Sequence, residues 1–131
     1  MRLEGKVAVI TGAGSGLGRQ CAQLFTAEGA KVAIVDIDSE RAEQTLKLVT
    51  EDDGDAIAIT ADVSDKAQIT AAIDQTVEHY GKLDIAWANA GVVSRGGAAT
   101  LGIGDPVLFE DMTEEDWNDV LGVNLTGVVY T

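Results

Sequence analysis

The sequence predicts an α/β domain with a doubly wound parallel sheet and helices on both of its faces. Two observations carry this prediction. Short apolar segments of strand length alternate along the chain with longer segments of helical periodicity. The apolar segments are also nearly continuous, which is typical of strands that are buried on both faces of a parallel sheet. We expect the connections between these strands to be right-handed.

The expected strands cover residues 6–10, 31–35, 56–60 and 83–88. Three amphipathic helices separate them. The first begins in a glycine-rich stretch and ends near Gly29, which is a common residue after a helix C-terminus. The second opens at Ser39 and ends before Gly54, and Ser64 is expected to cap the third. With this alternation, the fourth strand is expected beside the first, on an open apolar edge.

The fourth helix is predicted from Thr113-Glu114-Glu115-Asp116, which resembles a capping box. Its apolar stripe, expected to face the core, consists of Trp117, Val120, Leu121, Leu125 and Val128. Asn124 lies on this stripe, so we expect a buried, hydrogen-bonded amide that is either a core residue or a functional one.

Before this helix, residues 92–112 form a long irregular connection, and connections of that length are commonly functional or disordered. The chain stops at Thr131 inside the last helical pattern. We therefore interpret residues 1–131 as one incomplete domain that represents the first half of a doubly wound sheet.

Composition narrows the class of protein. The chain has 131 residues, of which 46% are hydrophobic, and a net charge of −13 with nine basic residues. This charge argues against nucleic acid or an anionic membrane as a partner. The single cysteine, Cys21, excludes an internal disulfide, and no apolar run is long enough to span a bilayer. We expect a cytoplasmic protein without a metal site.

Residues 11–18, with the sequence TGAGSGLG, place a glycine at every second position directly after the first strand. At a strand-to-helix junction, this pattern predicts a backbone that a phosphate group can approach at the helix N-terminus. We expect Gly12, Gly14 and Gly16 to clear space for a pyrophosphate, and Gly18 to let the helix pack against the sheet. A merely structural tight turn is the alternative.

Asp36 ends the second strand, about 20 residues after the glycine turn, where an acidic side chain can accept hydrogen bonds from an adenosine ribose. Its carboxylate would repel a 2′-phosphate, and neither Ser15 nor Ile37 is basic. The sequence therefore favours NAD over NADP. Asp62 and Asn89 also follow strands at the edge of the sheet where such folds bind ligands, although Asn89 could equally tie strand ends together.

In order along the chain, these motifs resemble those of the short-chain dehydrogenase/reductase family, which has a Rossmann-type fold. The matching elements are TGAGSGLG, Asp36, Ala61-Asp62-Val63, Asn89-Ala90-Gly91 and Val123-Asn124-Leu125-Thr126-Gly127. One departure is Ala88, because the family commonly has two consecutive asparagines before Ala-Gly.

The resemblance implies a nicotinamide dinucleotide cofactor and a role for each matching residue. Thr11 would brace the glycine turn against the strand end at Asn89, and Asn124 would be the asparagine of the catalytic tetrad. The implied cofactor-binding residues are Gly12, Ser15, Gly16, Leu17, Gly18, Asp36, Ile37, Asp62, Val63, Asn89, Ala90 and Gly91.

The resemblance also implies a serine and a tyrosine followed four residues later by a lysine, which this chain lacks. The tyrosines are Tyr80 and Tyr130, and Asp84 stands four residues after Tyr80. A phenol needs a lowered pKa to exchange protons at neutral pH. We therefore expect cofactor binding without turnover from residues 1–131.

The complete enzyme would transfer a hydride between the nicotinamide and an alcohol or ketone carbon, as a homodimer or homotetramer. A non-catalytic nucleotide-binding or interaction module is the alternative, and an α/β domain without a ligand is a third reading.

Overall fold

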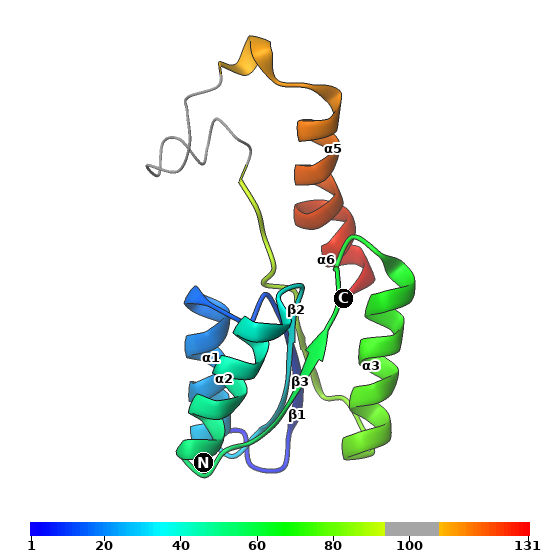
Figure 1. The fold of residues 1–131 in the computed structure, drawn as a ribbon. Helices are drawn as coiled ribbons and strands as arrows, with labels where there is room; N and C mark the ends of the chain where they lie inside the picture. Colours follow the sequence, from blue (N-terminus) through cyan, green and yellow to red (C-terminus); the bar gives the residue numbers. More distant parts are fainter. Residues whose placement is uncertain (94–107) are drawn as a thin grey trace.

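The computed structural model describes residues 1–93 and 108–131, so most of the predicted irregular connection lies outside the described residues. Four strands, β1 (Val7–Thr11), β2 (Lys31–Asp36), β3 (Asp55–Thr60) and β4 (Ile85–Trp87), form one parallel sheet in the order β3-β2-β1-β4 (Figure 1). The fourth strand pairs with the first, as the sequence predicts.

Helices cover both faces of the sheet. α1 (Gly16–Ala27) and α2 (Ser39–Glu51) lie together on one face, and α3 (Lys66–Tyr80) lies on the other (Figure 1). Beyond residue 107 the chain forms a 3₁₀-helix (Phe109–Asp111), α5 (Glu114–Leu121), a π-helix (Gly122–Thr126) and α6 (Gly127–Tyr130). α6 contacts α3, so the last part of the chain joins the α3 face of the sheet.

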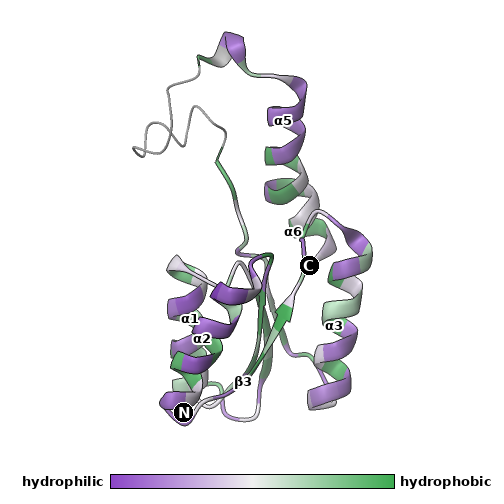
Figure 2. Cartoon of the chain, viewed as in Figure 1, coloured by the Kyte–Doolittle hydropathy of each residue, from purple (hydrophilic) through white to green (hydrophobic). Residues whose placement is uncertain are grey.

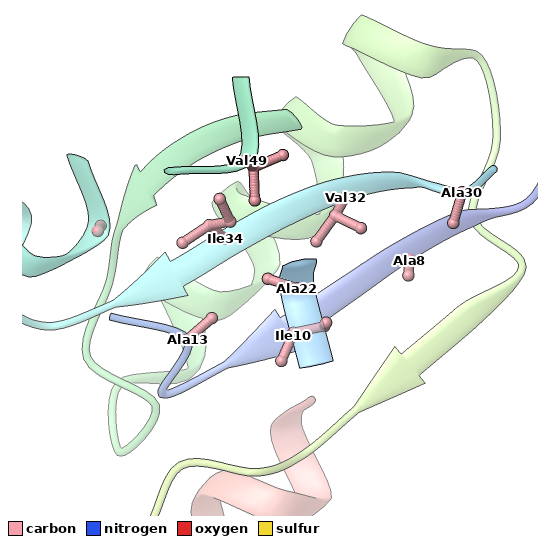
Figure 3. Packing of buried hydrophobic residues seen from close by; sticks show 9 residues of the cluster. Ala8, Ile10, Ala13, Ala22, Ala30, Val32, Ile34 and Val49 are labelled. Atoms are coloured by element: carbon pink, nitrogen blue, oxygen red, sulfur yellow. The ribbon is translucent and has the colours of Figure 1, made fainter. Parts of the chain in front are cut away.

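The core alternates along β1 and β2 because successive side chains of a strand point to opposite faces. On the α1/α2 face, Ala8, Ile10, Val32 and Ile34 pack against Ala22, Ala42 and Val49 (Figure 3). On the α3 face, Val9, Ala33 and Val35 pack against Ile69 and Ala72. Each fully buried valine or isoleucine contributes about 1.5–3 kcal/mol. β1 and β2 are therefore buried on both faces, as their apolar runs predict.

Three helices begin at a side chain that caps them. Asp38 accepts a hydrogen bond from the Arg41 backbone N–H at the start of α2. Asp65, not Ser64 as the sequence analysis predicts, caps α3 by accepting from the N–H groups of Ala67 and Gln68. α5 has the predicted capping box, in which Thr113 and Asp116 bond each other's backbone N–H.

The pKa of Asp65 is lowered. The largest cause is the hydrogen bond that it accepts from the Gln68 side chain, followed by the two backbone N–H bonds.

The edge strand β4 is held at its start by Asp84. The carboxylate of Asp84 accepts a hydrogen bond from Val7 N at 2.9 Å and forms ion pairs with Lys82 at 2.8 Å and Lys6 at 3.8 Å. The Lys82 ammonium, followed by the Val7 N–H, holds the pKa of Asp84 below its usual range. This side chain ties the start of β4 to the start of β1.

The predicted apolar stripe of the last helix is not buried, which corrects the sequence analysis. Trp117 is 51% exposed, Leu125 59% and Val128 46%. The segment packs instead through Gly127, on which a Cβ would lie 2.7 Å from the Val63 side chain, and through Val123 and Tyr130. In Figure 2 the strands are mainly hydrophobic, whereas α5 carries both hydrophilic (purple) and hydrophobic (green) residues. Within the described ranges, no helix is long and apolar enough to cross a bilayer.

Candidate cofactor site

The glycine turn that joins β1 to α1 is packed tightly against the segment that follows β4. Gly12 has φ +65°, and a Cβ there would lie 2.8 Å from Ala90 Cα. A Cβ on Gly18 would overlap the Gly12 carbonyl and lie 2.7 Å from Asn89 Nδ2 and 2.8 Å from Ala13 Cα. Gly18 therefore brings the first turn of α1 close to the sheet edge, as the sequence analysis predicts.

Gly14 and Gly16 face different surroundings. A Cβ on Gly14 would lie 2.7 Å from both Asp36 Oδ2 and Arg41 Cβ, whereas a Cβ on Gly16 would meet nothing within 4 Å. The prediction that the glycines at positions 12, 14 and 16 all clear space for a ligand is wrong for the first two. Their missing side chains make room for protein atoms, and Gly16 is the one that faces open space.

The N-terminus of α1 has no cap of its own. Ser15 is the N-cap residue, but its side chain makes no capping hydrogen bond, and the first turn holds no acidic residue. The first N–H groups of a helix have no intrahelical acceptor. The N–H groups of Gly16, Leu17 and Gly18 therefore present the positive end of the helix dipole, where an anion binds favourably.

Thr11 and Asn89 lock the glycine turn to the end of β4. Thr11 Oγ1 accepts hydrogen bonds from Asn89 N at 3.1 Å and from Ala90 N at 3.2 Å. Asn89 Nδ2 donates to the carbonyls of Thr11 at 2.9 Å and Gly12 at 3.4 Å. The bracing role implied for Thr11 is confirmed, and Asn89 ties the two strand ends together.

A second brace, which the sequence analysis missed, holds the turn from α2. Thr45 is fully buried and donates to the Ala13 carbonyl at 3.0 Å. Arg19 Nε donates to Thr45 Oγ1 at 3.0 Å, and its Nη2 donates to the Gly14 carbonyl. The sequence did contain a signal for this brace, since Thr45 stands between the apolar residues of α2. A buried hydroxyl requires a hydrogen-bond partner, so a contact from this residue could have been expected.

Asp36 is held in place at the end of β2. Its Oδ2 accepts from Gly14 N at 2.8 Å and its Oδ1 from Asp38 N at 3.0 Å. A carboxylate has about four acceptor positions, so each oxygen can accept one further hydrogen bond. The side chain is thus oriented by the backbone and can still accept from two hydroxyl groups.

These elements surround one cavity of about 430 Å³ at the carboxyl ends of the strands. Every predicted cofactor-binding residue except Gly18 lines it: Gly12, Ser15, Gly16, Leu17, Asp36, Ile37, Asp62, Val63, Asn89, Ala90 and Gly91. Gly18 lies behind the turn. The sequence analysis missed four lining residues, Arg41, Ala61, Val92 and Val123. Arg41 could have been found, because the first turn of a helix that follows a strand lies at the same edge of the sheet.

Asp62 lies between this cavity and a second one of about 380 Å³, which also borders α5. Its Oδ1 accepts from Ser64 N at 2.8 Å and from Ser64 Oγ at 2.7 Å. Ser64 therefore closes a turn with Asp62 instead of capping α3, because its hydroxyl is already used two residues upstream.

Asn124 contacts the first cavity indirectly. Its Oδ1 accepts from Val92 N at 2.8 Å, and its Nδ2 donates to the Val92 carbonyl at 2.8 Å. The expected hydrogen bonds are present, but the residue is exposed, so the expected burial is wrong. The π-helix that contains it changes the helical phase on which that expectation rested. The amide fixes the backbone that leaves Gly91.

Tyr80, the last residue of α3, lies away from the site, beside the start of β3. Its hydroxyl donates to Asp55 Oδ1 at 3.1 Å, and burial raises its pKa further above the usual range, assisted by the Asp55 charge. Neither of the two cavities includes a tyrosine among its lining residues in the described part of the chain. The described site therefore offers binding groups and no phenolic proton donor.

A parallel sheet in this order, with an uncapped glycine turn and a strand-end carboxylate on one cavity, defines the class of Rossmann-type nucleotide-binding domains. Residues 6–131 match the short chain dehydrogenase family, and the chain belongs to this family of oxidoreductases.

The chain is 39% identical to an uncharacterized oxidoreductase of Thermotoga maritima and 41% identical to elsinochrome reductase 1 of Elsinoe fawcettii. These matches cover 97% and 98% of the chain but 45% of each relative, so the chain spans about half the length of the relatives it matches.

Two solved structures are similar over nearly the whole chain. A short-chain dehydrogenase/reductase from Burkholderia phymatum, in complex with NAD, has a TM-score of 0.87 and 34% identity, over 99% of this chain and 42% of that one. A 3-ketoacyl-(acyl-carrier-protein) reductase from Brucella melitensis, complexed with NADH, has a TM-score of 0.84 and 40% identity, over 98% and 48%. The α/β fold predicted from the sequence is confirmed.

Proposed function

We propose that this chain forms the cofactor-binding half of an NAD-dependent oxidoreductase that acts on an alcohol or ketone. One observation carries the proposal: the uncapped N-terminus of α1 and the Asp36 carboxylate open onto the same cavity of about 430 Å³. The N–H groups of α1 suit a pyrophosphate, and the carboxylate suits a ribose diol at the adenosine end. The residues present therefore fit a nicotinamide dinucleotide.

NAD is favoured over NADP because of the Asp36 charge. Two unit charges 4 Å apart near a protein surface repel each other by about 4 kcal/mol, and a 2′-phosphate would stand where the ribose hydroxyl meets this carboxylate. The backbone N–H groups of Gly14 and Asp38 fix both carboxylate oxygens, so the side chain cannot turn away without losing these bonds.

At the other end of the cavity, Asn89, Ala90 and Gly91 would border the nicotinamide, which supplies or accepts the hydride when the cofactor is bound. Asn124 acts as a positioning residue in the described part of the chain, because its amide holds both backbone groups of Val92 next to this wall. The proton-exchanging tyrosine of the complete enzyme would have to stand outside residues 1–131.

The partners of the complete enzyme belong to the same proposal. A homodimer or homotetramer is supported by the apolar side chains that α5, the π-helix and α6 leave exposed, since exposed apolar surface is commonly used in protein–protein interfaces. These side chains are Trp117, Leu125, Val128 and Val129. Cytoplasmic localisation, a small-molecule substrate and the lack of a nucleic-acid or membrane partner are also part of this proposal, which the family membership and the acidic charge support.

Calorimetric titration with NAD and NADP tests the proposal directly. Wild-type protein should bind NAD more tightly than NADP. Asp36→Ala should weaken NAD binding roughly 10- to 100-fold, because hydrogen bonds to a charged group are worth about 1.5–3 kcal/mol. The same change should leave NADP binding unchanged or improved. An Asp36→Ala variant with the wild-type preference would contradict the ribose assignment.

A further inference from the structure

The glycine turn is held by its carbonyl groups. Side chains from three parts of the chain donate to the carbonyl groups of residues 11–14: Asn89 to those of Thr11 and Gly12, Thr45 to that of Ala13, and Arg19 to that of Gly14. The next carbonyl, that of Ser15, accepts from the Arg19 backbone N–H at 3.1 Å. Each carbonyl group between the end of β1 and the start of α1 therefore has a donor within the protein.

Two of these donors lie behind the turn. Ala13 and Gly14 are buried and do not line the cavity, whereas Ser15, next in the chain, is exposed and lines it. Thr45 and Arg19 do not line the cavity either. The carbonyl groups of Ala13 and Gly14 are thus directed toward side chains on the far side of the turn.

The direction of a carbonyl group fixes the direction of the N–H group that follows it. In a planar trans peptide, the C=O and the next N–H point in opposite directions. Because the Gly14 carbonyl is held on Arg19, the N–H of Ser15 points away from Arg19. A rotated peptide would instead turn a carbonyl oxygen, with its partial negative charge, toward the N–H groups at the start of α1, which suit an anion.

Thr45 connects this turn to α2. Its side chain is fully buried, and its Oγ1 accepts from Arg19 Nε at 3.0 Å. The same Oγ1 lies 3.0 Å from the Ala13 carbonyl and 3.2 Å from the Arg41 carbonyl, one helical turn earlier. A hydroxyl has one proton, and its contact to Ala13 is the shorter of the two. One oxygen atom of α2 therefore holds the turn directly and also through Arg19.

We propose that Thr45 and Arg19 are positioning residues of the phosphate-binding turn, which hold the carbonyl groups of Ala13 and Gly14 away from the cavity so that N–H groups face a bound diphosphate. Both residues act through the backbone that they hold. This inference rests on the proposed function, because it concerns the turn proposed for the pyrophosphate. It adds a buried hydroxyl of α2 to the groups on which cofactor affinity depends.

The test compares ADP with adenosine, two probes that differ by the diphosphate, titrated into the 131-residue chain and followed by NMR of the backbone N–H groups. Thr45→Val removes the hydroxyl without changing the charge, and Thr45→Ser keeps the hydroxyl. Thr76→Val is the matched control. Thr76 is also fully buried, but its Oγ1 donates to the Ala72 carbonyl of its own helix, at 2.7 Å.

Thr45→Val should weaken ADP binding roughly 3- to 10-fold, as expected for the loss of one hydrogen bond that orders the turn, and should leave adenosine binding unchanged. Thr45→Ser should keep the wild-type ratio of the two affinities, and Thr76→Val should change neither affinity. In the wild type, ADP should shift the N–H signals of Ser15, Gly16 and Leu17.

A purely structural role of Thr45 would lower the melting temperature of Thr45→Val without changing the ratio of the two affinities. Equal weakening of both probes by Thr45→Val, or weakening of neither, would overturn the inference. An equal loss of ADP affinity in Thr76→Val would overturn it as well. So would a Thr45→Ser variant as weak as Thr45→Val, because the shape of the side chain would then matter and not its hydroxyl.

Arg19→Met is an independent variant, which frees the Gly14 carbonyl and leaves the buried hydroxyl in place. Its matched control is Lys47→Met, which also removes one positive charge, from a lysine of α2 that pairs with Glu51 at 3.8 Å. Arg19→Met should weaken ADP binding more than Lys47→Met does, and neither variant should change adenosine binding. Equal effects of the two variants would overturn the role of Arg19, because charge alone would explain them.

A parallel titration of the wild type with NAD separates the two proposals. If neither NAD nor ADP shifts any N–H signal of the folded wild type, the proposed function fails and the inference falls with it. If both bind and shift the signals of Gly16 and Leu17, but Thr45→Val leaves the ratio of ADP to adenosine affinity unchanged, the inference alone fails.

Discussion

The N-terminus of α1 and the N-termini of α2, α3 and α5 solve the same electrostatic problem in opposite ways. Every helix begins with N–H groups that have no intrahelical acceptor. Asp38, Asp65 and Thr113 satisfy those groups from within the chain, whereas Ser15 makes no such bond and α1 has no acidic residue in its first turn. The chain carries a net charge of −13. Of these four helix starts in the described ranges, the start of α1 is the one without an anionic side chain at its N-cap or in its first turn, and it opens onto the cavity.

The difference teaches that α1 gives up a stabilising cap at the helix start where the proposed function places the pyrophosphate. A cap contributes about 1 kcal/mol, and α1 forgoes it. In exchange, the turn is braced by Thr11, Asn89, Thr45 and Arg19, whose hydrogen bonds stabilise a backbone shape that no cap holds. The start of α1, which lacks a cap, is therefore held by hydrogen bonds to the strand ends and to α2.

The largest expected effect comes from breaking the brace at Gly18. Gly18→Ala would place a Cβ against the Gly12 carbonyl, 2.7 Å from Asn89 Nδ2. Overpacking of this kind costs about 1–3 kcal/mol and occasionally more. We expect a lower melting temperature and loss of NAD binding together. Gly122→Ala is the control, because a Cβ there would meet only Ser64 Cβ, at 3.6 Å. A Gly18→Ala variant as stable as that control would show that the close packing is not needed.

Giving α1 the cap that it lacks is the second test. Ser15→Asp adds an N-cap carboxylate, which should raise stability by about 1 kcal/mol in thermal or denaturant unfolding. The same charge should weaken NAD binding roughly tenfold or more, because it occupies the N–H groups proposed for the pyrophosphate.

Ser15→Ala is the matched control for that test. Because the Ser15 side chain makes no capping bond, its loss should leave stability unchanged within about 0.5 kcal/mol. If Ser15→Asp raises stability and leaves NAD affinity intact, the α1 N-terminus is not the pyrophosphate site.

The smallest effect concerns a cap that is already present. The folded-state pKa of Asp65 is lowered, so its contribution to stability is complete above the usual pKa of about 3.9 and is lost as the pH falls through the lowered value. Asp65→Asn should match the wild type at pH 7, since asparagine caps equally well.

Denaturant unfolding between pH 6 and pH 2 checks this prediction for Asp65. The wild type should lose more stability than Asp65→Asn below about pH 4. Parallel curves for the two proteins down to pH 2 would show that the Asp65 cap does not depend on its charge.

Local pattern was enough to predict the elements, and it failed where tertiary contacts compete with it. The strands, their order and the capping box at Thr113 follow from apolar runs and short motifs, and the structure confirms them. Ser64 was predicted to cap α3 because serine is a common N-cap residue. In the structure its hydroxyl donates to Asp62 instead. The last helical segment has a regular apolar stripe in the sequence, which predicted the buried side. The π-helix and the close approach of Gly127 to Val63 turn a different side of the segment toward the core.

The sequence by itself determined the glycine turn, the carboxylate at the end of β2 and their common edge, because alternation of strands and helices brings the carboxyl ends of parallel strands together. Only the tertiary structure decided which atoms occupy the space that each missing side chain leaves. At Gly14 this space is taken by Asp36 and Arg41, whereas Gly16 faces open space. It also decided that Arg41 lines the cavity together with Asp36 and that Asn124 holds Val92. The physical reason is that spacing fixes which residues reach one edge of a sheet, whereas packing fixes the direction in which each side chain points.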